Sequence, residues 1–203
     1  MKNNNFNVFL ESKLKNLVLK TALNLLKTII LLFIISLSID AVKKVFHLIQ
    51  HSIYGGQKIE IFKIQLTDHF NTNLYHFFLA TVILLGLYLL YLLFSFKTVI
   101  SNFINDTIFT PENCKQLKNI GNGLVAYATI LIVLEIFFRG VLGFNEINFS
   151  KDPAVNLGYN FGFVSTTIIK QKLPIFLVAM FLQFISYVLV KGNKIQQEND
   201  LTI

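Results

Sequence analysis

Two charged side chains interrupt a long apolar stretch in the second half of the chain. Glu135 and Arg139 are four residues apart, so a helix would place them on one face. Each would cost about 2.5–3.5 kcal/mol near the centre of a bilayer. The two side chains therefore need an ionic partner, a water-filled cavity or a position close to the membrane surface.

Asp40 has the same predicted depth as Arg139, because each lies roughly 27 Å along its helix from the start of an apolar run. We therefore predict an ion-pair cluster of Asp40, Glu135 and Arg139 between the first and third helices. The favoured interpretation is structural: a salt bridge fixes helix packing while Arg139 extends towards the surface. The alternative is a site for a ligand or a proton.

The histidines are concentrated in one part of the chain, in or beside the first predicted loop: His47, His51, His69 and His76. His47 and His51 have the spacing that places two imidazoles on one helix face, which makes them a candidate metal or pH-sensing site. No third ligand has a diagnostic spacing. A simple position at the membrane interface is the favoured interpretation of this pair.

The elements that must position these residues are four apolar runs, at about 22–46, 75–96, 121–144 and 173–191. The chain is 54% hydrophobic and 14% charged, which is a membrane composition rather than a soluble one. Each run has the roughly 20 residues that a helix needs to cross the hydrocarbon layer. Uninterrupted runs exclude the alternating pattern of a membrane barrel. The sequence predicts an all-α membrane protein with four transmembrane helices, forming one domain over residues 1–203.

Two further features concern the ends and loops of these helices. Residues 5–20 have apolar positions at helical spacing, which predicts an amphipathic helix on the membrane surface or a helical extension of the first span. Residues 58–66 and 156–168 are partly strand-like and could pair as a small extracytoplasmic sheet. The alternative is that both are irregular loops.

The orientation follows from the positive charges near the first span. An even number of spans places both termini on one side, and Lys2, Lys13, Lys15 and Lys20 precede or begin the first helix. Because positive residues remain in the cytoplasm and the first helix usually dominates, we expect cytoplasmic termini and an inner-membrane location. The scattered lysines flank apolar runs, so the lipid bilayer is the expected partner and direct nucleic-acid binding is not expected.

Two polar segments on that side resemble a known family. The ending LVKGNKIQQENDLTI, residues 189–203, and the block FTPENCKQLKNIG, residues 109–121, are similar to the bacterial four-span proteins of domain-of-unknown-function family 2975. Lys191 stands where an arginine is expected, and the aliphatic residues 188–190 where an aromatic is common. The resemblance implies the four-span layout and a small helix-turn-helix regulator as a candidate partner.

No nucleotide-binding, serine-hydrolase or zinc-protease fingerprint is present, and Cys114 stands alone, so no cofactor and no catalysis are indicated. We expect a non-enzymatic regulatory component that docks a soluble regulator. The predicted docking face consists of Thr110, Pro111, Glu112, Lys115, Lys118, Glu198, Asp200, Leu201, Thr202 and Ile203. A small transporter or channel, acting as a homo-oligomer, and an accessory subunit of a membrane complex are the alternatives.

Overall fold

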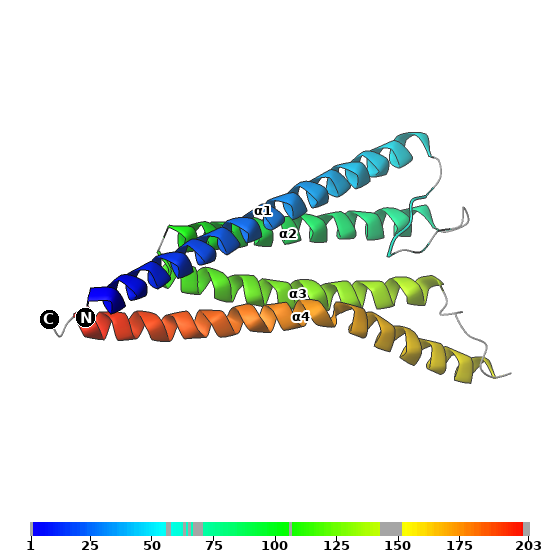
Figure 1. Ribbon diagram of the computed structural model, residues 1–203. Coiled ribbons are helices and arrows are strands. Elements are labelled where there is room, and N and C mark those ends of the chain that lie inside the picture. Colours follow the sequence, from blue (N-terminus) through cyan, green and yellow to red (C-terminus); the bar gives the residue numbers. More distant parts are fainter. Residues whose placement is uncertain are drawn as a thin grey trace.

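The computed structural model consists of four long helices connected by loops (Figure 1). It describes residues 2–55, 58–62, 64, 66, 71–105, 107–142 and 152–200, with side chains from residue 16 to residue 199. The helices are α1 (Lys2–Tyr54), α2 (Thr72–Ile104), α3 (Pro111–Leu142) and α4 (Pro153–Asp200). Each predicted span lies within one of these helices, apart from the last residues of the third, which fall outside the described residues.

All four helices are long and apolar enough to cross a membrane. Large apolar side chains cover their outer surfaces: Leu84 is 65% exposed and Phe181 is 61% exposed. Exposed apolar surface on this scale is costly in water, whereas lipid tails solvate it. The predicted architecture of a multi-pass all-α membrane protein is therefore confirmed.

α1 is one continuous helix from Lys2 to Tyr54, so the amphipathic stretch 5–20 extends the first span. It ends at Gly55, which has a φ of 69° and donates its amide to the His51 oxygen at 3.0 Å. Glycine adopts this left-handed conformation without the steric cost that a side chain would bring. The end of α1 is thereby fixed where the sequence places its pair of glycines.

α3 and α4 begin with the same local chemistry. At the start of α3, Thr110 accepts the amide of Asn113 on its hydroxyl at 3.2 Å, and Pro111 occupies the first helical position. At the start of α4, Asp152 accepts the amide of Ala154 at 2.9 Å and is likewise followed by a proline. Both caps satisfy amides that have no partner within the helix. Thr110 with Pro111, and Asp152 with Pro153, are therefore local signals for the starts of these two helices.

The small sheet predicted between the two loops is not formed by the described residues. Residues 58–66 contribute an isolated bridge between Ile61 and Ile64, and residues 156–168 lie within α4. The second segment is helical because its buried side chains recur every four residues, at Asn160, Val164 and Ile168. The Asp152 cap was the sequence signal that distinguished this helix from a strand.

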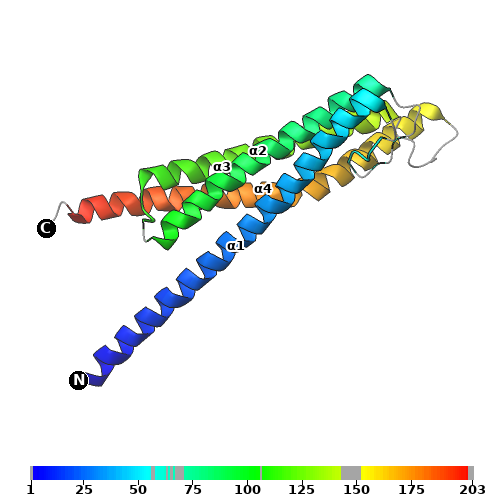
Figure 2. The ribbon, with the colours of Figure 1, turned by 90° about the horizontal axis from the view of Figure 1, so that it is seen from above.

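Helices that follow one another in the chain pack together. Backbone contacts join α1 to α2, α2 to α3 and α3 to α4, whereas α1 makes none with α3 or α4 within the described ranges. Figure 1 shows two hairpins that separate towards their loops, and both termini lie at the opposite end. Seen from above, α1 crosses the other helices at an angle (Figure 2). The fold is therefore an open pair of hairpins.

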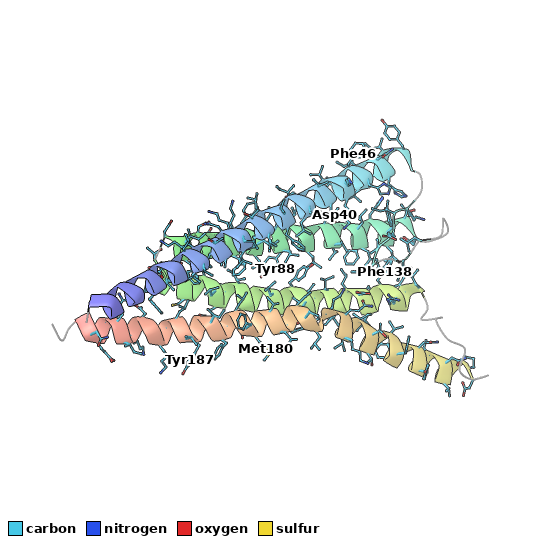
Figure 3. The ribbon with its side chains drawn as sticks, in the orientation of Figure 1. Asp40, Phe46, Tyr88, Phe138, Met180 and Tyr187 are labelled. Atoms are coloured by element: carbon cyan, nitrogen blue, oxygen red, sulfur yellow. The ribbon has the colours of Figure 1, made fainter. Side chains whose placement is uncertain are left out.

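Aromatic and aliphatic side chains fill the contact between α2 and α3. Phe78 and Phe138 are fully buried, with ring centroids 4.7 Å apart in an edge-to-face arrangement. Tyr88 and Phe138 lie between these helices, and Tyr187 points away from the bundle (Figure 3). This core joins α2 to α3 and so connects the two hairpins.

Candidate functional site

The charged residues of α3 form an ion-pair cluster with α4. Glu135 has a side chain only 4% exposed, and its Oε1 accepts a hydrogen bond from Arg139 Nη2 at 3.4 Å. Lys172 of α4 places its Nζ 3.3 Å from Oε2 of the same carboxylate, at an ion-pair distance but without hydrogen-bond alignment. The predicted pairing of Glu135 with Arg139 is therefore present, with Lys172 as an additional cation.

The structure corrects the third predicted member of this cluster. Asp40 is 55% exposed and forms an ion pair with Lys44, one turn further along α1. The depth estimate placed Asp40 at a level along the membrane normal but gave no lateral position, and α1 packs against α2 rather than α3. Lys172 takes the place of Asp40 because the segment that carries it is helical and packs on α3.

Asp40 and Lys172 nevertheless line one cavity, which we call the polar cleft. It has a volume of about 740 Å³ and lies between the two hairpins, near their loops. Its charged lining residues are Asp40, Lys43, Lys44, Glu60 and Lys172, and the titratable His47 and Tyr127 also line it. Neither Glu135 nor Arg139 lines this cavity, and its charged side chains come from α1, α4 and the segment 58–62.

A second cavity lies deeper and is lined almost entirely by apolar side chains. This apolar groove has a volume of about 440 Å³ and receives residues from all four helices, among them Ile30, Leu92, Ile120 and Leu182. Pro174 of α4 also lines it. Because proline lacks an amide hydrogen and disrupts the helical ladder, it accounts for the change of direction of α4 in Figure 1.

The histidines of the first hairpin lie close together. His51 Nδ1 is 3.0 Å from His76 Nε2, and the ring of His47 is 6.2 Å from that of His51. The described residues contain no group of three histidine, cysteine or acidic side chains arranged to hold a metal ion. His69 lies outside the described residues. His51 therefore has a hydrogen-bond partner, His76, that helix spacing alone did not reveal.

Three residues of the predicted docking face, Pro111, Lys115 and Lys118, line one cavity together with residues of α4. The start of α3 and the end of α4 enclose a cavity of about 370 Å³, which we call the basic cleft. It is lined by Pro111, Cys114, Lys115, Lys118, Ser186, Val190, Asn193, Lys194 and Gln197. Thr110 and Glu112 belong to the cap and first turn of α3, whereas Glu198 is exposed near the end of α4. The side chain of Asp200, and Leu201, Thr202 and Ile203, lie outside the described residues.

The turn that leads into this cleft is built around Asn113, a residue that no sequence pattern singled out. Its side chain is fully buried, accepts a hydrogen bond from Asn102 Nδ2 at 2.7 Å and donates one to the Thr107 oxygen at 2.5 Å. A buried amide with all these partners fixes the α2–α3 connection. The signal in the sequence was a polar residue at the third helical position after a threonine cap.

Residues 58–203 match the family described as "Protein of unknown function (DUF2975)". The chain belongs to this family. The matched DUF2975 region contains α2, α3 and α4, and hence the basic cleft, Asn113 and the Glu135 cluster. It begins after the end of α1, whose backbone contacts with other helices, within the described ranges, are with α2. Neither a curated protein nor a solved structure matches the chain.

Close packing at one glycine explains how the DUF2975 region brings the ends of α3 and α4 together. A Cβ atom on Gly192 would lie 2.5 Å from Cε1 of Phe109, so the aromatic ring before the α3 cap rests directly on α4. Ser186 adds a hydrogen bond from its hydroxyl to the Cys114 oxygen at 2.7 Å. The resemblance found in residues 109–121 and 189–203 thus corresponds to two segments that contact each other.

Proposed function

We propose that this chain is a non-enzymatic docking component of the bacterial inner membrane, with both termini in the cytoplasm. It holds a small soluble regulator of helix-turn-helix type at that end of the bundle. The observation that carries the proposal is the basic cleft, where segments some 70 residues apart in the sequence form one concave surface. A regulator held there is kept away from DNA until it is released.

Charge supports a protein partner with an acidic patch. Lys115 and Lys118 on α3 and Lys194 on α4 are all exposed, and they approach the cleft from both of its walls. Complementary charge guides encounter and sets orientation, and it contributes less to affinity than the buried contacts do. The aliphatic side chain of Val190, together with Pro111, supplies an apolar lining for such contacts.

Rigidity of the cleft supports binding of a folded partner. The Thr110 cap, the Asn113 hydrogen bonds and the contact of Phe109 with Gly192 all fix the backbone around the cavity before any partner arrives. A surface that is already ordered loses little conformational entropy when it binds. These features therefore favour docking over a role in which this end of the molecule folds only on contact.

Co-purification tests this proposal. The full chain, extracted from its native cells in a mild detergent with an affinity tag, is expected to retain a small helix-turn-helix protein. The triple variant Lys115→Gln, Lys118→Gln and Lys194→Gln should reduce the recovered partner at least tenfold, because it removes the charges on both walls of the cleft.

The matched control removes charge from the other end of the molecule. Lys43→Gln with Lys44→Gln should leave recovery unchanged, since both residues line the polar cleft near the opposite loops. Equal recovery with the triple variant and the native chain would overturn the proposal. So would failure of the native chain to retain any DNA-binding protein.

A further inference from the structure

The polar cleft and the apolar groove share a wall. Tyr127 of α3 lines both cavities, so a cavity with charged side chains adjoins one with aliphatic side chains at this residue. The two together extend from the loop end of the hairpins towards the middle of the bundle. A lipid has the same arrangement, with a polar head group attached to apolar chains.

The floor and rim of the apolar groove differ in exposure. Ile30, Leu92 and Ile120 form a floor that is at most 5% exposed, whereas Phe33 and Val178 on the rim are each more than half exposed. In a protein that spans a membrane, exposed apolar side chains of this kind face lipid tails. The groove is therefore accessible from the side, through the bilayer itself.

The length of the combined opening corresponds to one leaflet. Thirteen residues of α1 separate Lys43 from Ile30, which is about 20 Å along the helix. On α4, ten residues separate Lys172 from Leu182, which is about 15 Å. Half of a hydrocarbon layer of about 30 Å has a similar depth. A lipid chain that starts at the lysines would reach the end of the groove.

The charged side chains of the polar cleft indicate which kind of lipid head group would bind there. Lys43, Lys44 and Lys172 line the polar cleft together with the two carboxylates of Asp40 and Glu60. Asp40 pairs with Lys44 and Glu135 pairs with Lys172, so these cations are held in place around the opening. An ammonium group is a strong point donor to phosphate oxygens, and lysine clusters near a membrane surface attract anionic lipids.

We propose that this opening binds one anionic phospholipid of the surrounding bilayer. Its phosphate lies among Lys43, Lys44 and Lys172, and an acyl chain occupies the apolar groove beside Ile30 and Leu92. The lipid would fill the space where the two hairpins separate and would join α1 to α4, which share no backbone contacts within the described residues. The site is separate from the basic cleft and does not depend on its function.

Native mass spectrometry of the detergent-solubilised full chain tests the proposal, with phosphatidylglycerol as the probe. We expect one tightly retained phosphatidylglycerol, bound at least tenfold more tightly than phosphatidylcholine. Inorganic phosphate should not compete at millimolar concentration, because it lacks the acyl chain. Equal affinity for the two lipids, or displacement by phosphate alone, would overturn the assignment.

Two matched pairs of variants locate the site. Lys43→Gln with Lys44→Gln should weaken phosphatidylglycerol binding by about fivefold for each charge, and Lys115→Gln with Lys118→Gln should leave it unchanged. Val178→Trp should fill the groove and prevent retention, whereas Met180→Trp, two residues away and 63% exposed, should not. Equal binding in both members of either pair would contradict the proposal. This lipid measurement gives the same answer whether or not the protein binds a regulator at the basic cleft.

Discussion

Ser186 donates a hydrogen bond of 2.7 Å to the main-chain oxygen of Cys114, and both residues are 4% exposed between α3 and α4. A carbonyl group in a helix normally accepts a hydrogen bond from an amide of its own helix. The Cys114 oxygen accepts this further hydrogen bond from another helix, so the contact joins α3 to α4. Both residues line the basic cleft. The stability of that surface therefore depends on a hydroxyl group that no periodicity of the sequence indicates.

The Cys114 thiol should be protected while this contact holds. In the native protein a maleimide reagent is expected to label Cys114 slowly, and labelling should accelerate sharply in denaturant. Ser186→Ala should lower stability by about 0.5–1.5 kcal/mol, the usual contribution of one hydrogen bond, and raise the labelling rate. Rapid labelling of the native protein would show that the α3–α4 contact is open. The Cys114→Ser variant serves as the unlabelled control.

Lys172 and Glu135 should be energetically coupled. Lys172→Gln removes one cation from a carboxylate that is 4% exposed, and we expect a loss of about 1.5–3 kcal/mol in thermal unfolding. Glu135→Gln should also destabilise the protein, because it leaves Arg139 and Lys172 close together without an anion. The double variant should lose less than the sum of the two. Additive losses would indicate that the two residues do not interact.

Gly121 and Gly86 should respond oppositely to alanine. A Cβ on Gly121 would lie 2.9 Å from the main-chain oxygen of Ala179, which cannot move without shifting α4. Gly121→Ala should therefore cost about 1–3 kcal/mol. A Cβ on Gly86 would have no neighbouring atom within 4 Å, so Gly86→Ala should be neutral or slightly stabilising. Unfolding in detergent compares the two, and equal effects would contradict the close approach of α3 and α4.

The α1–α2 contact should weaken in acid. The bond between His51 Nδ1 and His76 Nε2 needs one nitrogen without a proton, and protonation of both rings removes that acceptor. Burial, and then the nearby His76, His47 and Lys58, hold the pKa of His51 below its ordinary value. Because the unfolded chain therefore takes up this proton first, the unfolding temperature should fall as the pH drops below about 6.5, and His76→Gln should reduce this dependence. A pH-independent native protein would exclude the pair as its cause.

Cysteine accessibility can test the orientation of the helices. Tyr54 is 82% exposed at the loop end of α1, and Lys194 is exposed near the end of α4. With cytoplasmic termini, Tyr54→Cys should react with a membrane-impermeant maleimide in intact spheroplasts, and Lys194→Cys should react only after the membrane is opened. The buried Cys114 provides a low background. The reverse pattern would place the basic cleft outside the cell and contradict the docking proposal.

The features that the sequence predicted correctly depend on apolar length and local helix chemistry. The four spans and the pairing of Glu135 with Arg139 each depend on residues that lie close together in the chain. The contacts of Lys172 with Glu135 and of His76 with His51 depend on how separate helices are placed laterally. Hydrophobic periodicity contains no such information, so Asp40 was assigned to a cluster that Lys172 completes.

The predicted strand in residues 156–168 was wrong for a different reason. Residues 156–168 are rich in aromatic and β-branched side chains, which favour strands in a soluble sheet. Within or beside a membrane the backbone must satisfy its own hydrogen bonds, and a helix does this without a partner strand. The Asp152 and Pro153 pair marked the start of that helix, as Thr110 and Pro111 did for α3.

The order of contacts, from α1 to α2 to α3 to α4, has a consequence for biosynthesis. Within the described residues, α2, α3 and α4 each contact the helix made just before them, so α1 alone has to wait for a later helix to emerge. Contacts between neighbours in the chain also carry the smallest loop-closure entropy, which favours rapid folding. Membrane insertion can therefore proceed one helix at a time from the ribosome, with α4 completing the molecule last.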